Sequence, residues 1–142
     1  MSILFFSEDV DFPKLKKRKT TNWIKQIIGL HNSSVGDISF IFCSDLYLLS
    51  VNKQYLNHDY YTDIITFDYV DNGVISGDIF ISVERVAENA ASFNTDLGNE
   101  MSRVIIHGVL HLLGFKDKTD QESKAMREKE DFCIKILEKG EF

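Results

Sequence analysis

The segment IIHGVLHLLGFKDK, residues 105 to 118, places His107 and His111 four residues apart within an apolar run. Side chains four residues apart lie on the same face of a helix, so both imidazoles can point at one metal ion. Gly114 can end this helix because glycine accepts a positive φ, and Asp117 is the next side chain able to bind a metal. The pattern H-x-x-x-H-x-x-G-x-x-D therefore predicts a metal site at the end of a helix, formed by His107, His111 and Asp117.

This spacing matches the zinc segment of the metzincin proteases, with aspartate in place of the last histidine. Two imidazole nitrogens and one carboxylate oxygen fill three positions of a tetrahedral zinc shell. The fourth position is then left for water, as in catalytic zinc sites. Asp120 is an alternative third ligand, although it is better placed to cap the following helix. We therefore expect one zinc ion as the cofactor and no small-molecule cofactor.

The general base of the metalloproteases is missing from this segment. In the pattern H-E-x-x-H, the glutamate after the first histidine acts as the base, and here that position is Gly108. Peptide hydrolysis by that mechanism is therefore disfavoured. Zinc can still activate water and polarise a phosphoryl oxygen, so cleavage of a phosphodiester by hydroxide or by a ribose 2′-OH remains open.

Composition and charge limit the classes of partner. The chain has 142 residues, 44% of them hydrophobic, and a net charge of -6, which argues against a protein that coats nucleic acid non-specifically. The basic run PKLKKRK, residues 13 to 19, is either a solvated segment or a patch that contacts phosphate. We expect Cys43 and Cys133 to be reduced and buried. No apolar run reaches the roughly 20 residues that cross a bilayer, and no signal peptide is recognisable, so we expect a cytoplasmic protein with no membrane partner.

Hydrophobic periodicity places most strands in the first half of the chain and most helices in the last third. Strands are expected at residues 2–10, 37–44, 62–70 and 74–83, with a turn at 71–73. Helices are expected from Thr21 or Asn22 to 31, at 46–57 after an Asp45 cap, at 84–95, at 97–114, and from Thr119 or Asp120 to 140. The helix at 46–57 is expected to turn Leu46, Leu49 and Tyr55 to one side. This order predicts an α+β fold in a single domain, residues 1–142.

Four segments, in the same order, resemble the YbeY family of bacterial rRNA maturation factors, which are metal-dependent single-strand endoribonucleases. HGVLHLLGFKD, residues 107 to 117, is similar to the family pattern H-G-x-L-H-L-x-G-[YF]-D-H. NKQYLNHDYYTDIITF, residues 52 to 67, is similar to N-x-x-Y-R-x-x-D-x-x-T-D-V-L-S-F. SGDIFIS, residues 76 to 82, resembles the family's G-D-I-x-I-S strand, and Met126 and Glu130 match residues of its C-terminal helix.

The resemblance, which spans roughly residues 38 to 137, implies a compact fold with a small mixed sheet packed with helices and a metal in a cleft beside it. It implies that His107 and His111 are the first two zinc ligands and that the substrate is RNA. The implied activity is a zinc-dependent single-strand endoribonuclease that processes ribosomal RNA, especially the 3′ end of the small-subunit rRNA, and serves ribosome quality control. Three further residues match the family and are expected to order the loop before the third strand, with a role at the site as the less favoured alternative: Asp59, Thr62 and Asp63.

The third ligand position differs from the family pattern. The family has histidine there, and this chain has Asp117, with Lys116 where the family has aspartate. The carboxylate brings a negative charge that imidazole does not, so it neutralises part of the charge of the metal. Lys116 and Lys118 are expected either to restore positive charge where a phosphate binds or to be solvated loop residues.

A second difference concerns the binding of phosphate. The family's arginine after the tyrosine corresponds to Leu56, which cannot pair with a phosphate. Either another cation replaces it, from Lys53 or from residues 14–19, or the activity differs in substrate or strength. Leu56 therefore favours a second hypothesis, a non-catalytic, metal-containing ribosome-assembly or RNA-binding factor. A third hypothesis, a zinc-dependent hydrolase of another substrate such as a peptide, is disfavoured by Gly108.

Overall fold

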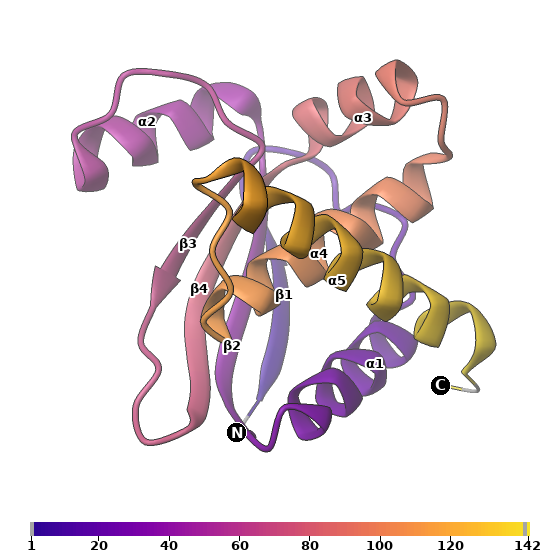
Figure 1. The fold of residues 1–142 in the computed structure, drawn as a ribbon. Helices are drawn as coiled ribbons and strands as arrows, with labels where there is room; N and C mark the ends of the chain where they lie inside the picture. The colour runs from indigo at the N-terminus through magenta and orange to yellow at the C-terminus, as the bar shows by residue number, and fades with distance from the viewer. Residues whose placement is uncertain (1, 141) are drawn as a thin grey trace.

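The computed structural model describes residues 2–140 and 142, and within them strands and helices form an α+β fold, as the sequence predicts (Figure 1). The strands of this part of the chain are β1 (Ile3–Ser7), β2 (Ser34–Cys43), β3 (Ile64–Asp68) and β4 (Val74–Ser82). Its helices are α1 (Lys17–Leu30), α2 (Asp45–Leu56), α3 (Val83–Ser92), α4 (Leu97–Leu112) and α5 (Asp120–Lys139). Across the described residues, none of the helices has the length and apolar character needed to cross a membrane.

The sheet is mixed, in the order β1-β2-β4-β3. The pairs β1–β2 and β2–β4 are parallel, and β3 runs antiparallel to β4. The turn between β3 and β4 contains Asn72 and Gly73, both with positive φ (49° and 74°). Two adjacent residues with positive φ are typical of a tight hairpin turn, so the turn predicted at residues 71–73 is confirmed.

The two faces of the sheet pack against different helices because neighbouring side chains of a strand point in opposite directions. In β4, Ile79 and Ile81 belong to the main core, whereas Phe80 packs with a second cluster that contains Leu48 and Ile65. Helices α1, α4 and α5 lie over the face of the main core, and α2 carries the second cluster (Figure 1). The site-bearing helix α4 is therefore enclosed between the sheet and α5.

Helix α4 lies unusually close to the sheet at Gly108. A Cβ atom at this position would lie 3.0 Å from Ile64 Cδ1 and 3.0 Å from Ile79 Cγ2, closer than side chains normally pack. The absence of a side chain at Gly108 lets the helix backbone approach β3 and β4. This contact fixes the rotation of α4 about its axis, and with it the direction in which His107 and His111 point.

Helices α1 and α2 differ from the sequence prediction in ways that packing explains. Helix α1 begins at Lys17 rather than near Thr21, because Thr20 is buried in the helix (6% exposed) and the basic run forms the first turn. Helix α2 is capped by Ser44 rather than by the predicted Asp45, which is its first residue; Ser44 Oγ accepts a hydrogen bond from Tyr47 N at 3.0 Å. The side of α2 predicted to carry Leu46, Leu49 and Tyr55 does not pack into the core: Leu46 and Tyr55 are exposed, and Leu48 and Val51 are buried.

Cys43 and Cys133 are buried free thiols, so the prediction of reduced cysteines is confirmed. Burial raises the pKa of Cys43 to about 12 and that of Cys133 to about 11. Both thiols therefore stay protonated near neutral pH and act as small apolar side chains in the core.

Gly77 in β4 makes a second close contact between the sheet and α4, and this contact can be tested with Gly77→Ala. A Cβ atom at Gly77 would lie 2.5 Å from Phe67 O and 2.9 Å from Leu112 Cδ2. We expect this substitution to lower the free energy of unfolding by about 1–3 kcal/mol, because backbone and helix must move apart. Urea unfolding followed by circular dichroism measures the difference.

Gly29→Ala is the matched control, since a Cβ atom there would have no atom within 4 Å and the residue lies in α1. It should leave the stability unchanged or raise it by up to about 1 kcal/mol. Equal stability of the two variants would contradict the close approach of α4 to the sheet.

A candidate metal centre and the cleft around it

Helix α4 presents His107 and His111 from successive turns near its C-terminal end. Their Nε2 atoms lie 3.0 Å apart, and their side chains are 21% and 29% exposed. The buried side of α4 holds both imidazoles at the edge of the core, where they remain accessible. The structure therefore places the two predicted histidines as the spacing required.

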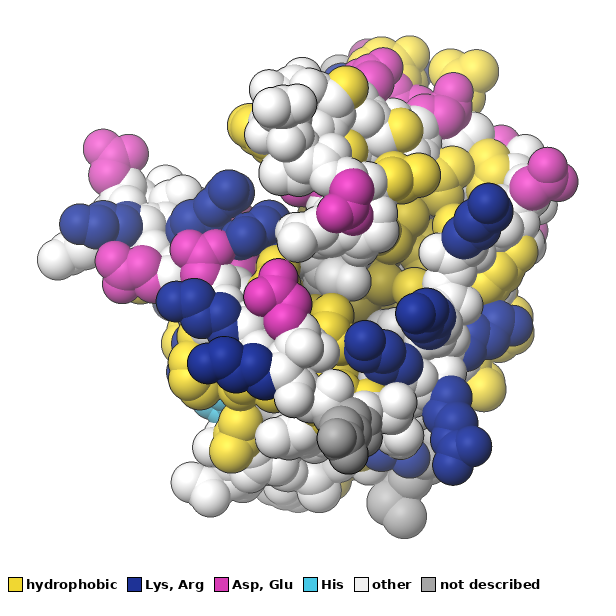
Figure 2. Space-filling model, turned by 90° about the vertical axis from the view of Figure 1, so that its right-hand side faces the viewer, with side chains coloured by type: hydrophobic (Ala, Val, Ile, Leu, Met, Phe, Trp, Pro, Cys, Tyr) yellow, Lys and Arg dark blue, Asp and Glu magenta, His cyan; other side chains and the backbone are white. Residues whose placement is uncertain are grey.

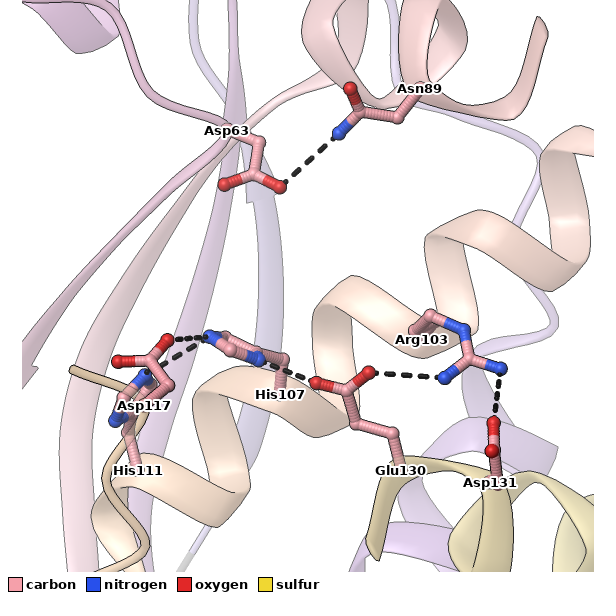
Figure 3. A network of polar contacts seen from close by, with 8 residues as sticks. All are labelled: Asp63, Asn89, Arg103, His107, His111, Asp117, Glu130 and Asp131. Carbon is pink, nitrogen blue, oxygen red and sulfur yellow. Dashed lines mark hydrogen bonds and ion pairs between the residues drawn. The ribbon is translucent and has the colours of Figure 1, made fainter. Parts of the chain in front are cut away.

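Gly114 turns the chain back over the end of α4. It has a φ of 101°, and its N–H donates to His111 O at 3.0 Å, while Phe115 N donates to Leu110 O at 3.0 Å. This is the glycine-terminated helix end that the sequence predicts. The turn brings Asp117 Oδ2 to 3.2 Å from His107 Nε2 and 3.3 Å from His111 Nε2 (Figure 3).

These three donor atoms match the spacing that one small divalent ion needs. Bonds of about 2.0–2.1 Å to a tetrahedral ion place its ligand atoms about 3.3 Å apart, close to the three observed separations. Among the described residues, His107, His111 and Asp117 are also the one group of three histidine, cysteine or acidic side chains whose ligand atoms converge in this way. Asp120, the alternative third ligand, starts α5 instead and is not part of the group. The residues present therefore fit a metal ion.

Glu130 of α5 orients His107 from the side opposite to Asp117. Its Oε2 lies 2.6 Å from His107 Nδ1, and its other oxygen accepts a hydrogen bond from Arg103 Nη1 at 3.0 Å (Figure 3). Arg103 also donates to Asp131 Oδ1 at 2.7 Å. Because a carboxylate can only accept, the neutral imidazole carries its proton on Nδ1, which leaves the Nε2 lone pair directed at the metal position.

The same contacts determine the charge of His107. Burial alone would lower the pKa of His107, but the hydrogen bond and charge of Glu130, with the charges of Asp117 and Asp63, outweigh it and raise the pKa above its ordinary value. Below this raised pKa, Nε2 carries a proton that a metal ion must displace, so metal affinity should fall in acid solution.

Two cavities flank the three donors. One, of about 330 Å³, lies between α3, α4 and α5 and includes Glu100 and Arg127 in its walls. The other, of about 440 Å³, follows β3. Asp63, His107 and Asp117 line both cavities, so the donors lie between two parts of one open cleft.

Asp63 faces the donors across this cleft. It immediately precedes β3, and its Oδ2 accepts a hydrogen bond from Asn89 Nδ2 of α3 at 3.3 Å (Figure 3). The sequence favours a role for Asp63 in ordering the loop, with a role at the site as the lesser alternative. The structure places Asp63 beside the cleft. The match to the family block marked this residue but did not indicate where it lies.

The cations predicted to contact phosphate do not line either cavity. Lys116 and Lys118 are exposed on the loop that carries Asp117, and Lys53 forms an ion pair with Asp59 at 3.2 Å. Residues 14–19 lie where α1 begins, and on the face that carries α1 the basic side chains are interrupted by apolar and acidic ones (Figure 2). The arginines in the cavity walls are instead Arg103 and Arg127, neither of which the sequence analysis identified.

Comparison of this chain with known proteins identifies its family. The family model described as "Endoribonuclease YbeY" matches residues 6–138. Proteins named "Endoribonuclease YbeY" are similar to nearly the whole chain. The protein from Parabacteroides distasonis is 50% identical over 137 residues, and the match covers 96% of both chains. The protein from Christiangramia forsetii is 54% identical over 135 residues, and the match covers 95% of this chain and 94% of that protein. The solution structure of TM1509 from Thermotoga maritima is 28% identical, with a TM-score of 0.69, and the match covers 96% of this chain and 89% of that one.

Glu100 is a buried acidic residue of the cleft that sequence reasoning missed. It lies in the first turn of α4, is 5% exposed and lines the smaller cavity. Within residues 2–140 and 142, neither carboxyl oxygen has a hydrogen-bond or ion-pair partner. Burial raises the pKa of Glu100, and the opposing charges of Arg103 and Arg127 only partly offset this effect. At neutral pH an ionised Glu100 therefore lowers the stability of the fold.

We expect Glu100→Gln to stabilise the metal-free protein at neutral and alkaline pH. A carboxyl with a raised pKa in the folded state stabilises the fold only when it is protonated, and this contribution is lost as the pH rises through the folded-state pKa. Glutamine stays neutral, so the free energy of unfolding of the variant should exceed that of the wild type at about pH 8 and approach it toward about pH 4.3, the ordinary glutamate pKa. Urea unfolding in the presence of EDTA at several pH values measures this difference.

Glu128→Gln, at an exposed position of α5, is the matched control and should change stability little at any pH. If the wild type is as stable as Glu100→Gln at pH 8, ionised Glu100 does not destabilise the fold and the prediction is wrong.

Proposed function

The chain belongs to the YbeY endoribonuclease family, and we propose that it is a zinc-dependent endoribonuclease that cleaves phosphodiester bonds in ribosomal RNA. Its proposed roles are maturation of the 3′ end of the small-subunit rRNA and quality control of ribosomes. Because this substrate is made and processed in the cytoplasm of bacteria, the proposed location is cytoplasmic. Membership of the family supports the cleavage of RNA, and the proposal of zinc as the metal rests on the geometry and donor atoms of the site.

The convergence of three donor atoms carries the proposal. His107 and His111 come from α4 and Asp117 from the loop beyond it, yet their ligand atoms lie 3.0–3.3 Å from one another at the wall of an open cleft. A structural zinc site is closed by a fourth protein ligand, whereas three ligands beside a cleft leave a position for substrate or water. This arrangement is suited to chemistry on a bound phosphodiester.

The donor set supports zinc in particular. Two imidazole nitrogens and one carboxylate oxygen suit a borderline metal such as zinc better than magnesium or calcium, which prefer oxygen ligands. When bound, zinc would polarise a phosphoryl oxygen and increase the nucleophilicity of water. Glu130 would keep the His107 ring in place during this chemistry, since partners of metal-bound imidazoles typically set ring orientation and metal affinity.

Asp63 is the residue best placed to take the proton of the nucleophile. The position used by the base in H-E-x-x-H is Gly108, where a Cβ atom would lie 3.0 Å from the side chains of Ile64 and Ile79, so a glutamate there would have to displace them. Asp63 lines both cavities beside His107 and Asp117, and Asn89 holds one of its oxygens. A carboxylate across the cleft from the metal ligands can accept a proton from water or from a ribose 2′-OH.

Lys116 and Lys118 are proposed to add positive charge at the mouth of the site, since they flank Asp117 in sequence and are exposed.

A second candidate function is a non-catalytic, metal-containing ribosome-assembly factor. The observation that favours it is Leu56, which is 39% exposed at the end of α2 and offers no charge for a phosphate. The two candidates differ in one outcome, metal-dependent cleavage of RNA.

His111→Ala tests the proposed metal site and its activity together. Loss of one of three ligands should reduce zinc affinity by more than about 100-fold, the upper end of the loss found for outer-shell partners. Cleavage of single-stranded RNA should disappear with the zinc. Zinc content by atomic emission and cleavage of a labelled RNA, with and without EDTA, measure both effects.

His58→Ala is the matched control, because His58 is exposed and contacts Tyr60 rather than the cleft. It should bind zinc and cleave RNA as the wild type does. Zinc binding without RNA cleavage by the wild type would favour the assembly factor, and full activity of His111→Ala would reject the site.

Asp63→Asn tests the proposed proton acceptor. The amide has nearly the same shape but cannot accept the proton, so kcat should fall by about 10²- to 10⁴-fold while zinc content and KM change little. Asp59→Asn, at an exposed residue paired with Lys53, should retain wild-type kcat. A kcat within about twofold of the wild type for Asp63→Asn would remove Asp63 from this role.

A further inference from the structure

The smaller cavity contains a carboxyl group that neither the fold nor the proposed cleavage chemistry uses. Glu100 is 5% exposed and lines this cavity, and it has no hydrogen-bond or ion-pair partner among the described residues. Its oxygens are not among the fully buried side-chain atoms that lack a partner, so they are accessible from the cavity, where a ligand can reach them. A ligand with hydrogen-bond donors that enters the cavity would satisfy Glu100.

The mouth of this cavity carries groups suited to a flat, negatively charged ligand. Phe93, at the end of α3, is 57% exposed, and Arg127 of α5 lies over its ring with 6.0 Å between the guanidinium carbon and the ring centroid. No carboxylate lies within ion-pair distance of Arg127 in the part of the chain that the structure describes. Exposed aromatic rings and guanidinium groups stack on unpaired nucleobases, and an arginine without a partner can also bind phosphate.

The position and size of the cavity restrict what it can hold. Asp63, His107 and Asp117 form part of its wall, so a ligand in it adjoins the proposed cleavage centre. Its volume of about 330 Å³ lies at the lower end of the range of about 300–1,000 Å³ typical of small-molecule sites. A single nucleotide of an RNA strand fits these limits, whereas a base held in a duplex could not turn into the cavity.

We propose that this cavity binds the base of the nucleotide next to the cleaved phosphodiester, and that Glu100 selects bases with an exocyclic amino group. This inference rests on the proposed endoribonuclease function and adds a specificity site to it. A carboxylate accepts a hydrogen bond from the N4 amino group of cytosine. Uracil has a carbonyl oxygen at the same position, which a carboxylate repels, so cytosine is preferred over uracil. Phe93 stacks on the base, and Arg127 contacts the adjoining phosphate.

The test compares two single-stranded RNA oligonucleotides, all uridine except that one has a single central cytidine. The zinc-loaded wild type should cleave next to the cytidine with a kcat/KM about tenfold or more above that at a uridine. In Glu100→Gln the amide can donate to the carbonyl of uracil, so the preference should fall to less than about twofold or reverse. Glu128→Gln should keep the wild-type preference. Circular dichroism and zinc content establish that each variant is folded and loaded.

Arg127→Gln separates the two roles assigned to the cavity. It should raise KM for both oligonucleotides by a similar factor and leave the ratio between them unchanged. A wild type without preference, or a Glu100→Gln variant that keeps the wild-type ratio, overturns the proposal.

Binding distinguishes failure of this inference from failure of the proposed function. If the wild type cleaves neither oligonucleotide, fluorescence anisotropy measures how tightly the wild type and Glu100→Gln bind the same RNAs. Tighter binding of the cytidine-containing RNA by the wild type than by Glu100→Gln then supports the base site without the nuclease. Equal or undetectable binding by both proteins overturns the base site.

Discussion

The close seating of α4 on the sheet is the constraint on which the site depends. Gly108 lets the helix backbone approach β3 and β4, with Ile64 and Ile79 filling the place of a side chain. This contact fixes the rotation of the helix, so His107 and His111 point toward the cleft rather than into the core. The glycine that takes the place of the protease-type base is therefore also the residue that positions the candidate metal ligands, and the proposed chemistry needs a proton acceptor elsewhere.

The charges of the site are balanced by partners from separate elements. Glu130 is 7% exposed, yet both of its oxygens are satisfied, one by His107 and one by Arg103. Asp117 adds a second carboxylate on the opposite side of His107. A divalent ion between these groups would offset the negative charge that they bring. Glu100 differs from Glu130 because the charges of Arg103 and Arg127 only partly offset its burial and no described residue forms a hydrogen bond with it, which is why it points to a ligand rather than to a structural role.

Local spacing predicted the convergence of His107, His111 and Asp117 because all three lie within one helix end and its turn. The α+β class followed from periodicity, since it depends on the order of the elements and not on their contacts. Residues brought to the cleft from distant elements, Asp63 and Glu100 among them, left no comparable spacing signal. The sequence predicts too late a start for α1 because Thr21 and Asn22 are typical capping residues, whereas the burial of Thr20 depends on tertiary packing.

The most direct test of the metal centre is the anomalous scattering of a crystal of the zinc-loaded protein, measured at the zinc absorption edge. We expect one strong peak within about 2.0–2.2 Å of His107 Nε2, His111 Nε2 and one carboxylate oxygen of Asp117, with no fourth protein ligand. A peak held by other residues, or a protein loaded at one zinc per chain with these three side chains uncoordinated, would contradict the site and the chemistry assigned to it.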